Sequence, residues 1–204
     1  MPNDSHVSQE PRFEPGPLLR LLEQHGVRFV VIGGLAGNLH GSTSVTLDLD
    51  ICYSRATEDL KRLAAALLDL DVTLRGADSG LPFRPDVKTL RAGLNFTFDT
   101  QFGPFDCLGE ASGYTYEVLA PNAIGADLGG YRVQAASLDD LIRMKRAAGR
   151  LKDLNEVANL EKLREVREQR GLFGLAEPVV ASRRSITAQR PSRGRAKARP
   201  RSRK

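Results

Sequence analysis

Two aspartates one residue apart, Asp48 and Asp50, are the residues best suited to chemistry in this sequence. The run from Thr46 to Cys52 alternates in hydrophobicity, which predicts a β-strand. In a strand, residues i and i+2 point to the same face, so these two carboxylates would lie side by side and repel each other. Binding of Mg²⁺ or Mn²⁺ would remove this repulsion, because hard oxygen ligands suit both ions. The alternative is a solvated strand face without a metal.

A third acid, Asp106, lies between apolar residues in a second predicted strand, 104–108. It would join the pair if the sheet brings the two strands together. The alternative is an exposed residue on a hairpin. Asp99 is another candidate for the third acid, but it lies next to the turn at 101–103 and is predicted to be structural.

Gly33 and Gly34 stand where a buried strand is predicted to meet a helix. Glycines at such a point let a polyphosphate approach the backbone, and a helix N-terminus offers free N–H groups. A tight turn without a ligand explains the pair equally well. A dinucleotide site is disfavoured, because the run from Ile32 to Gly37 lacks the first glycine of Gly-x-Gly-x-x-Gly.

The elements that would position these residues follow from apolar periodicity and from breaks at glycine and proline. They predict an α+β or α/β fold in which a small mixed central sheet is flanked by helices. Ser137, with Asp140 three residues later, resembles a capping box that opens a helix. The predicted helices are 18–26, 35–40, 57–70, 137–148 and 151–169, and the predicted strands are 28–32, 46–52, 94–99, 104–108 and short candidates near 115–118 and 131–135.

The predicted organisation has four parts. Residues 1–15 are a polar, disordered N-terminus, and 16–136 form the core. Residues 137–175 are C-terminal helices packed on that core, and 176–204 are a disordered basic tail.

Charge is divided unevenly along the chain. The formal net charge is +5, but residues 183–204 hold ten basic residues and no acid, which leaves 20 basic and 25 acidic residues in 1–182. The body is therefore acidic, at −5, and the tail accounts for the basic pI. Such a tail can gather RNA or DNA by counterion release, although a solvated tail without a partner is equally consistent with the sequence.

No apolar run approaches the roughly 18–20 residues needed to cross a bilayer. The polar N-terminus lacks a signal-peptide apolar region. Cys52 and Cys107 lie far apart and are predicted to be small core residues rather than a disulfide framework. We therefore expect a cytoplasmic protein without a membrane partner.

Together these motifs resemble the nucleotidyltransferase superfamily that includes DNA polymerase β-like and minimal nucleotidyltransferase proteins. The family pattern is an apolar residue, Gly, then Gly or Ser, about a dozen residues, Asp-apolar-Asp, and a third acid in a later strand. Gly33-Gly34 is followed here by thirteen residues and then by Asp48 and Asp50, with Asp106 as the third acid. The resemblance covers about residues 18–165. Many members carry Ser where this sequence has Gly34, so one hydroxyl contact to phosphate is missing.

The AbiEii-like branch of bacterial toxin–antitoxin and phage-defence proteins is the most similar. Its Thr-x-Asp-x-Asp pattern is matched from Thr46 to Asp50, and its helical lysine and Arg-x-Lys-Asp pattern by Lys145 and Arg150 to Asp153.

The resemblance implies a metal-dependent enzyme that moves a nucleoside monophosphate from an NTP to a hydroxyl. Asp48, Asp50 and Asp106 would hold Mg²⁺ or Mn²⁺ and form the catalytic set. The nucleotide would contact Gly33 and Gly34 through their backbone N–H groups, together with Ser42, Ser44 and Lys145. For the two serines a plain loop is the alternative, and for Lys145 a solvated helix residue.

The implied acceptors are RNA, especially a tRNA end, a protein side chain or a small molecule. A cognate toxin or antitoxin is an implied partner. The other hypothesis is a non-catalytic module that keeps the fold and acts as an antitoxin-like regulator.

Overall fold

The computed structural model describes residues 13–77, 83–169 and 171. Residues 1–12 of the predicted N-terminal segment, and 172–204 with the basic tail, lie outside this part. The helices are α1 (Pro15–Gln24), α2 (Gly33–Leu39), α3 (Thr57–Asp69), α4 (Val87–Ala92), α5 (Tyr116–Leu119), a 3-10 helix (Ala120–Asn122), α6 (Leu138–Ala148) and α7 (Leu151–Gln169). The strands are β1 (Phe29–Ile32), β2 (Leu49–Tyr53), β3 (Thr73–Leu74), β4 (Asn95–Thr100), β5 (Gly103–Leu108), β6 (Glu110–Ala111), β7 (Tyr114–Thr115), β8 (Ile124–Leu128) and β9 (Tyr131–Ala135).

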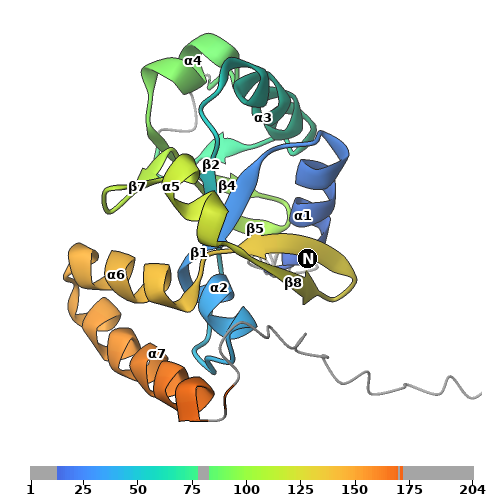
Figure 1. Cartoon of the computed structure of the whole chain (residues 1–204). Coiled ribbons are helices and arrows are strands. Elements are labelled where there is room, and N and C mark those ends of the chain that lie inside the picture. Colours follow the sequence, from blue (N-terminus) through green and yellow to red (C-terminus); the bar gives the residue numbers. More distant parts are fainter. Residues whose placement is uncertain (1–12, 78–82, 170, 172–204) are drawn as a thin grey trace, which may run out of the picture.

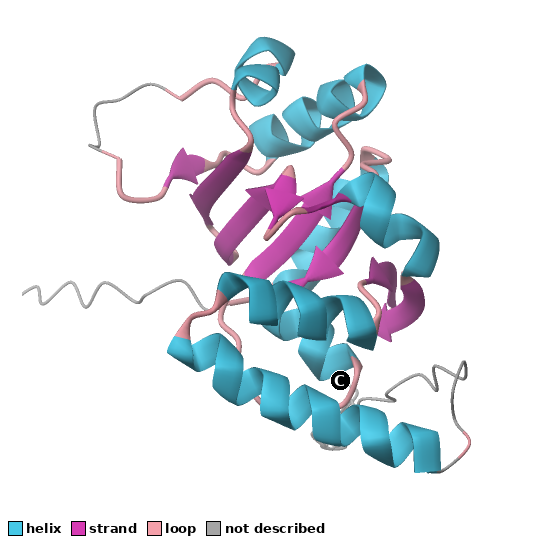
Figure 2. Cartoon of the chain, turned by 60° about the vertical axis from the view of Figure 1, so that its left-hand side comes forward, coloured by secondary structure: helices cyan, strands magenta, loops and turns pink. Residues whose placement is uncertain are grey.

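Seven strands form one mixed sheet in the order β3-β4-β5-β2-β1-β9-β8. The pairs β2–β5 and β1–β9 are parallel and the others are antiparallel. Helices lie on both sides of this sheet, as Figure 2 shows. The predicted α+β class with a small mixed sheet is confirmed.

The strands that carry the predicted site run through the middle of the sheet because their apolar side chains fill the core. Val30 and Val31 of β1 are buried, and so are Leu49 and Ile51 of β2. Cys52 and Cys107 are also buried in this core, as expected, and both are free thiols. Close packing of the core holds the backbone of these strands in place. The positions of the side chains on the opposite, polar face are therefore also well defined.

The two C-terminal helices form as predicted from local capping. The hydroxyl of Ser137 accepts a hydrogen bond from the backbone N–H of Asp140 at 3.1 Å, which caps α6. Gly149 ends that helix in the left-handed conformation, with φ 66°. Helix α7 then runs back alongside α6 (Figure 1), and α2 contacts α6 as well as strands β1 and β2.

Two details differ from the prediction. The segment predicted as a strand near 115–118 is the end of β7 followed by α5. The strand predicted from residue 46 begins at Leu49, and 42–47 are a segment that belongs to no helix or strand. Within the described ranges, no helix is long and apolar enough to span a bilayer.

Candidate active site

The three predicted aspartates lie together on one face of the sheet. Strands β2 and β5 pair in parallel, and their register places Asp50 directly beside Asp106. Asp48 lies just before β2, on the same side as Asp50, because Leu49 between them points into the core. Each aspartate offers a carboxylate oxygen within 4.8 Å of the others, and this is the only such group of His, Cys, Asp or Glu in the described part of the chain. Three hard oxygen ligands at this spacing fit a magnesium or manganese ion.

Gly33 lets this cluster lie against the start of α2. Its φ is +66°, and a Cβ built there would lie 1.9 Å from Oδ2 of Asp50. Both the backbone conformation and the lack of space require glycine at this position. The carboxylate therefore lies next to the first turn of α2, where N–H groups have no partner within the helix.

Position 34 is glycine for a different reason. A Cβ on Gly34 would lie 2.7 Å from Oγ1 and 2.9 Å from Cβ of Thr46. Thr46 in turn donates a hydrogen bond to Oδ1 of Asp48 at 2.9 Å. The segment 42–47 thus passes directly over the start of α2.

The electrostatics of the cluster follow from burial and like charge. Burial, and then repulsion by Asp48 and Asp106, raises the pKa of Asp50 to about 7. Burial also raises the pKa of Asp106, and the charge of Arg75 opposes that rise. A bound cation would stabilise the charged form of these carboxylates, because its positive charge offsets their mutual repulsion.

Arg75 was not predicted from the sequence. Its guanidinium lies 3.0 Å from a carboxylate oxygen of Asp106, and it also pairs with Asp99 at 3.0 Å and donates to the carbonyl of Phe98 at 2.7 Å. Asp99 therefore holds Arg75 rather than joining the cluster, as its structural prediction implied. Nothing in the sequence distinguished Arg75 from Arg84 and Arg91 in the same segment broken by glycine and proline, and the contact depends on β3 pairing with β4.

Lys145 of α6 is nearly buried rather than solvated. It pairs with Glu156 at 2.5 Å and lies 3.7 Å from Asp153, both on α7. Arg150 precedes α7 and pairs with Asp153 at 2.5 Å. The ion pairs of Lys145 therefore join α6 to α7, together with the pairs Arg146–Glu161 and Arg164–Asp139.

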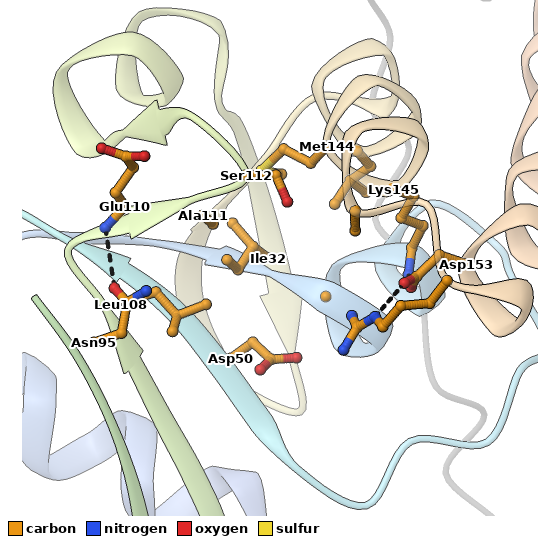
Figure 3. Close-up of a pocket in the computed structure, with 14 residues that line it drawn as sticks. Ile32, Asp50, Asn95, Leu108, Glu110, Ala111, Ser112, Met144, Lys145 and Asp153 are labelled. Carbon is orange, nitrogen blue, oxygen red and sulfur yellow. Dashed lines mark hydrogen bonds and ion pairs between the residues drawn. The ribbon is translucent and has the colours of Figure 1, made fainter.

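A cavity of about 220 Å³ borders the cluster at Asp50 and Gly33. Its apolar wall includes Ile32, Leu141 and Met144. Figure 3 shows Lys145 beside Asp153 at one end of this cavity and Asn95 with Glu110 at the other. One cavity is therefore lined by apolar side chains, by the edge of the carboxylate cluster and by Lys145.

The two predicted serines lie on the segment that leads to Asp48. Ser42 donates to the hydroxyl of Ser44 at 3.2 Å, and both are partly buried. His40, predicted to be a helix-end residue, caps the C-terminus of α2 and contacts the carbonyl of Ala136 at 2.8 Å.

Solved structures share this architecture. Lincomycin-bound LnuA, a lincosamide antibiotic adenylyltransferase, superposes with a TM-score of 0.52 at 12% identity, over 74% of this chain and 99% of LnuA. The chain has a nucleotidyltransferase fold. ANT(2″)-Ia in complex with adenylyl-2″-tobramycin is a more distant match, with a TM-score of 0.44 at 16% identity over 76% of this chain and 94% of that one. No protein-family model matches the sequence, and no curated protein matches it.

In this nucleotidyltransferase fold, the carboxylate cluster lies at the centre of the sheet, on β2, β5 and the residue before β2. The apolar cavity lies between this cluster, α6 and the end of β5.

Proposed function

We propose that this protein is a metal-dependent nucleotidyltransferase that moves a nucleoside monophosphate from an NTP to a hydroxyl acceptor. The observation that carries the proposal is the group of Asp48, Asp50 and Asp106, with oxygens within 4.8 Å of one another. Like charges this close are costly to bury unless a cation is bound. They lie next to Gly33, whose missing side chain leaves the start of α2 open to the cluster.

In the proposed reaction, the acceptor oxygen attacks the α-phosphorus of the NTP. The bond from that phosphorus to the bridging oxygen breaks, and pyrophosphate leaves. Asp48, Asp50 and Asp106 hold Mg²⁺ or Mn²⁺, which when bound would neutralise triphosphate charge and lower the pKa of the attacking hydroxyl. Asp106 also takes the acceptor proton, because it would lie beside the attacking hydroxyl.

The proposed nucleotide contacts come from the start of α2 and from the segment that joins α2 to β2. Backbone N–H groups of Gly33 and Gly34 contact phosphate oxygens, and Ser42 and Ser44 add hydroxyl contacts. Lys145 offers a positive charge at the cavity, although Glu156 and Asp153 already neutralise much of that charge. We therefore propose that Lys145 contributes to phosphate binding less than an unpaired lysine would.

The acceptor class is the finer part of the proposal. The cavity of about 220 Å³ is smaller than the roughly 300–1,000 Å³ pockets of drug-sized ligands, so it suits one ring system or one end of a larger substrate. LnuA is a lincosamide antibiotic adenylyltransferase, and this likeness supports small hydroxyl compounds as candidate acceptors. The basic residues of 183–204 support RNA, including a tRNA end, as a second candidate acceptor. A protein hydroxyl is the third candidate.

A role beside a cognate toxin or antitoxin, in the cytoplasm, is also part of the proposal and rests on the AbiEii-like motifs. The competing hypothesis of a non-catalytic module predicts that the metal-ligand set has decayed. The close approach of all three carboxylates favours the enzyme.

The test uses the full chain with each of the four NTPs, labelled at the α-phosphate, and Mg²⁺ or Mn²⁺. Acceptors are tRNA, total RNA, cell protein, lincomycin and other small hydroxyl compounds. We expect label transfer and pyrophosphate release with at least one acceptor. Neither product with any acceptor, together with undetectable calorimetric binding of Mg²⁺-ATP, would overturn the proposal.

Matched aspartate variants separate the cluster from general loss of charge. Asp48→Asn, Asp50→Asn and Asp106→Asn should each abolish transfer. Asp69→Asn should leave it unchanged, because Asp69 is exposed on α3 and, among the described residues, its carboxylate pairs only with His25. Equal transfer by the wild type and Asp50→Asn would contradict the assignment.

A further inference from the structure

Thr46 holds the first aspartate of the cluster in place. Its hydroxyl donates to Oδ1 of Asp48 at 2.9 Å. Within the described ranges, this is the only hydrogen bond that the Asp48 carboxylate receives, and Asp48 has no ion pair there. The same hydroxyl lies 3.4 Å from the backbone carbonyl oxygen of Asp48, and since it has one hydrogen to donate, the shorter contact to Oδ1 is the one that orients the carboxylate.

The segment around Thr46 directs the hydroxyl inward. Val45 and Leu47 on either side are 87% and 66% exposed, while Thr46 is partly buried. Burial alternates along these residues, and Thr46 and Asp48 are both partly buried, so the two side chains lie on the inner side of the segment. The two exposed neighbours therefore leave Thr46 as the contact between this segment and the start of α2.

Position 34 and position 46 compete for one space. A Cβ at Gly34 would meet Oγ1 of Thr46 at 2.7 Å and its Cβ at 2.9 Å. The φ of Gly34 lies outside the left-handed region, so space rather than backbone conformation keeps this residue small. The Cβ of Thr46 is attached directly to the backbone, which leaves it little freedom to move aside.

We propose that Thr46 is the positioning residue of Asp48, and that its side chain takes the space beside the cluster that a serine at position 34 would otherwise fill with its own hydroxyl. Thr46 orients one carboxylate oxygen and leaves the other to the cation. This inference rests on the proposed function, since it assigns Asp48 to a metal site. It explains why a chain with all three aspartates has glycine at position 34.

The first test measures binding of Mn²⁺ alone by calorimetry, without nucleotide or acceptor. Thr46→Val keeps the shape of the side chain and removes the hydroxyl. It should raise the Kd for Mn²⁺ about tenfold or more, the usual effect of losing a hydrogen bond to a metal ligand. Thr46→Ser should bind nearly as the wild type does. Thr73→Val, at an exposed threonine of β3, is the matched control and should have no effect.

The outcomes are separable from those of the proposed function. If the wild type does not bind Mn²⁺, the metal site itself fails. If the wild type binds and Thr46→Val binds equally well, the metal site stands and the role of Thr46 is refuted. Circular dichroism and the Tm of each variant confirm that it is folded.

The second test exchanges the two positions. Gly34→Ser alone should weaken Mn²⁺ binding, because the new Cβ displaces Thr46. Adding Thr46→Gly removes both clashing atoms and should restore part of the affinity. Gly34→Ser with Thr46→Gly should also bind more tightly than Gly34→Ala with Thr46→Gly, because only serine returns a hydroxyl. Equal binding by these two double variants would refute the exchange.

Discussion

Oδ2 of Asp50 occupies the space in which any side chain on Gly33 would begin, 1.9 Å from the position of a Cβ built on that residue. The backbone of Gly33 and the carboxylate of Asp50 are therefore in direct contact, and the glycine brings the cluster next to α2. This contact makes the glycine part of the site geometry rather than only a turn residue.

Gly33→Ala should disrupt the site more than its backbone strain explains. The left-handed φ costs about 1–2 kcal/mol for any residue with a Cβ, and the new methyl group must also push Asp50 away. We expect a lower Tm and at least a tenfold weaker Mn²⁺ affinity, on the order expected for a displaced ligand. Calorimetry and thermal unfolding measure both.

Gly129→Ala is the matched control for that variant. Gly129 has φ +65°, nearly the same as Gly33, but a Cβ there would meet nothing within 4 Å. It should lower the Tm by backbone strain and leave Mn²⁺ binding unchanged. If Gly33→Ala and Gly129→Ala behave alike, the Gly33–Asp50 contact has no role in the site.

Asp50 should make stability depend on pH when no metal is bound. Its pKa is about 7 in the folded protein, against 3.8 for an unperturbed aspartate, so the folded state holds a proton that the unfolded state has lost. The free energy of unfolding should therefore fall as pH rises from about 4 to about 7, and then level off. Urea unfolding in EDTA, compared between wild type and Asp50→Asn, measures this. The difference between the two should change through that interval, and a constant difference would contradict the assignment.

Arg75 should set the pH range in which Asp106 can bind a cation. Its charge lowers the pKa of Asp106, so Arg75→Gln should raise that pKa. The pH at which half of the Mn²⁺ affinity is reached should then shift upward, by about half a unit or more. Arg75→Lys keeps the charge and should shift less. An unchanged pH profile in Arg75→Gln would show that the ion pair at 3.0 Å does not act on the site.

A double variant can separate the ion pairs of Lys145 from its proposed role in phosphate binding. Lys145→Gln leaves Glu156 without its partner in a nearly buried position, which should cost about 3 kcal/mol in urea unfolding. Adding Glu156→Gln removes the unpaired charge and should recover much of that stability. If Lys145 also contacts the triphosphate, the double variant should still bind Mg²⁺-ATP about tenfold more weakly, the loss of one charge-assisted hydrogen bond. Recovery of both stability and ATP affinity would restrict Lys145 to a structural role.

Local patterns in the sequence were sufficient to predict several features of the site. The alternation around Asp48 and Asp50 places both on one face, because side chains on a strand alternate by backbone geometry alone. Ser137 marks the start of α6 and Gly149 marks its end. Both ends depend on hydrogen bonds and backbone conformations that involve only residues close in the sequence. Gly33 and Gly34 predicted the junction of a strand and a helix, which also depends only on neighbouring residues.

Other contacts depend on strand order and register, which no local pattern specifies. Asp106 could have faced Asp50 or solvent, and only the parallel pairing of β2 with β5 places them side by side. Arg75 reaches Asp106 because β3 and β4 pair across 24 residues of chain, and Lys145 meets Glu156 because α7 folds back on α6.

The sequence by itself determined the chemistry of this protein: which side chains can bind a cation or a phosphate, and on which face of their own strand or helix they lie. The tertiary structure alone decided which of them meet. The cost of burying like charges and the space beside Gly33 and Gly34 depend on atoms far apart in the chain, so those properties exist only once the sheet has formed.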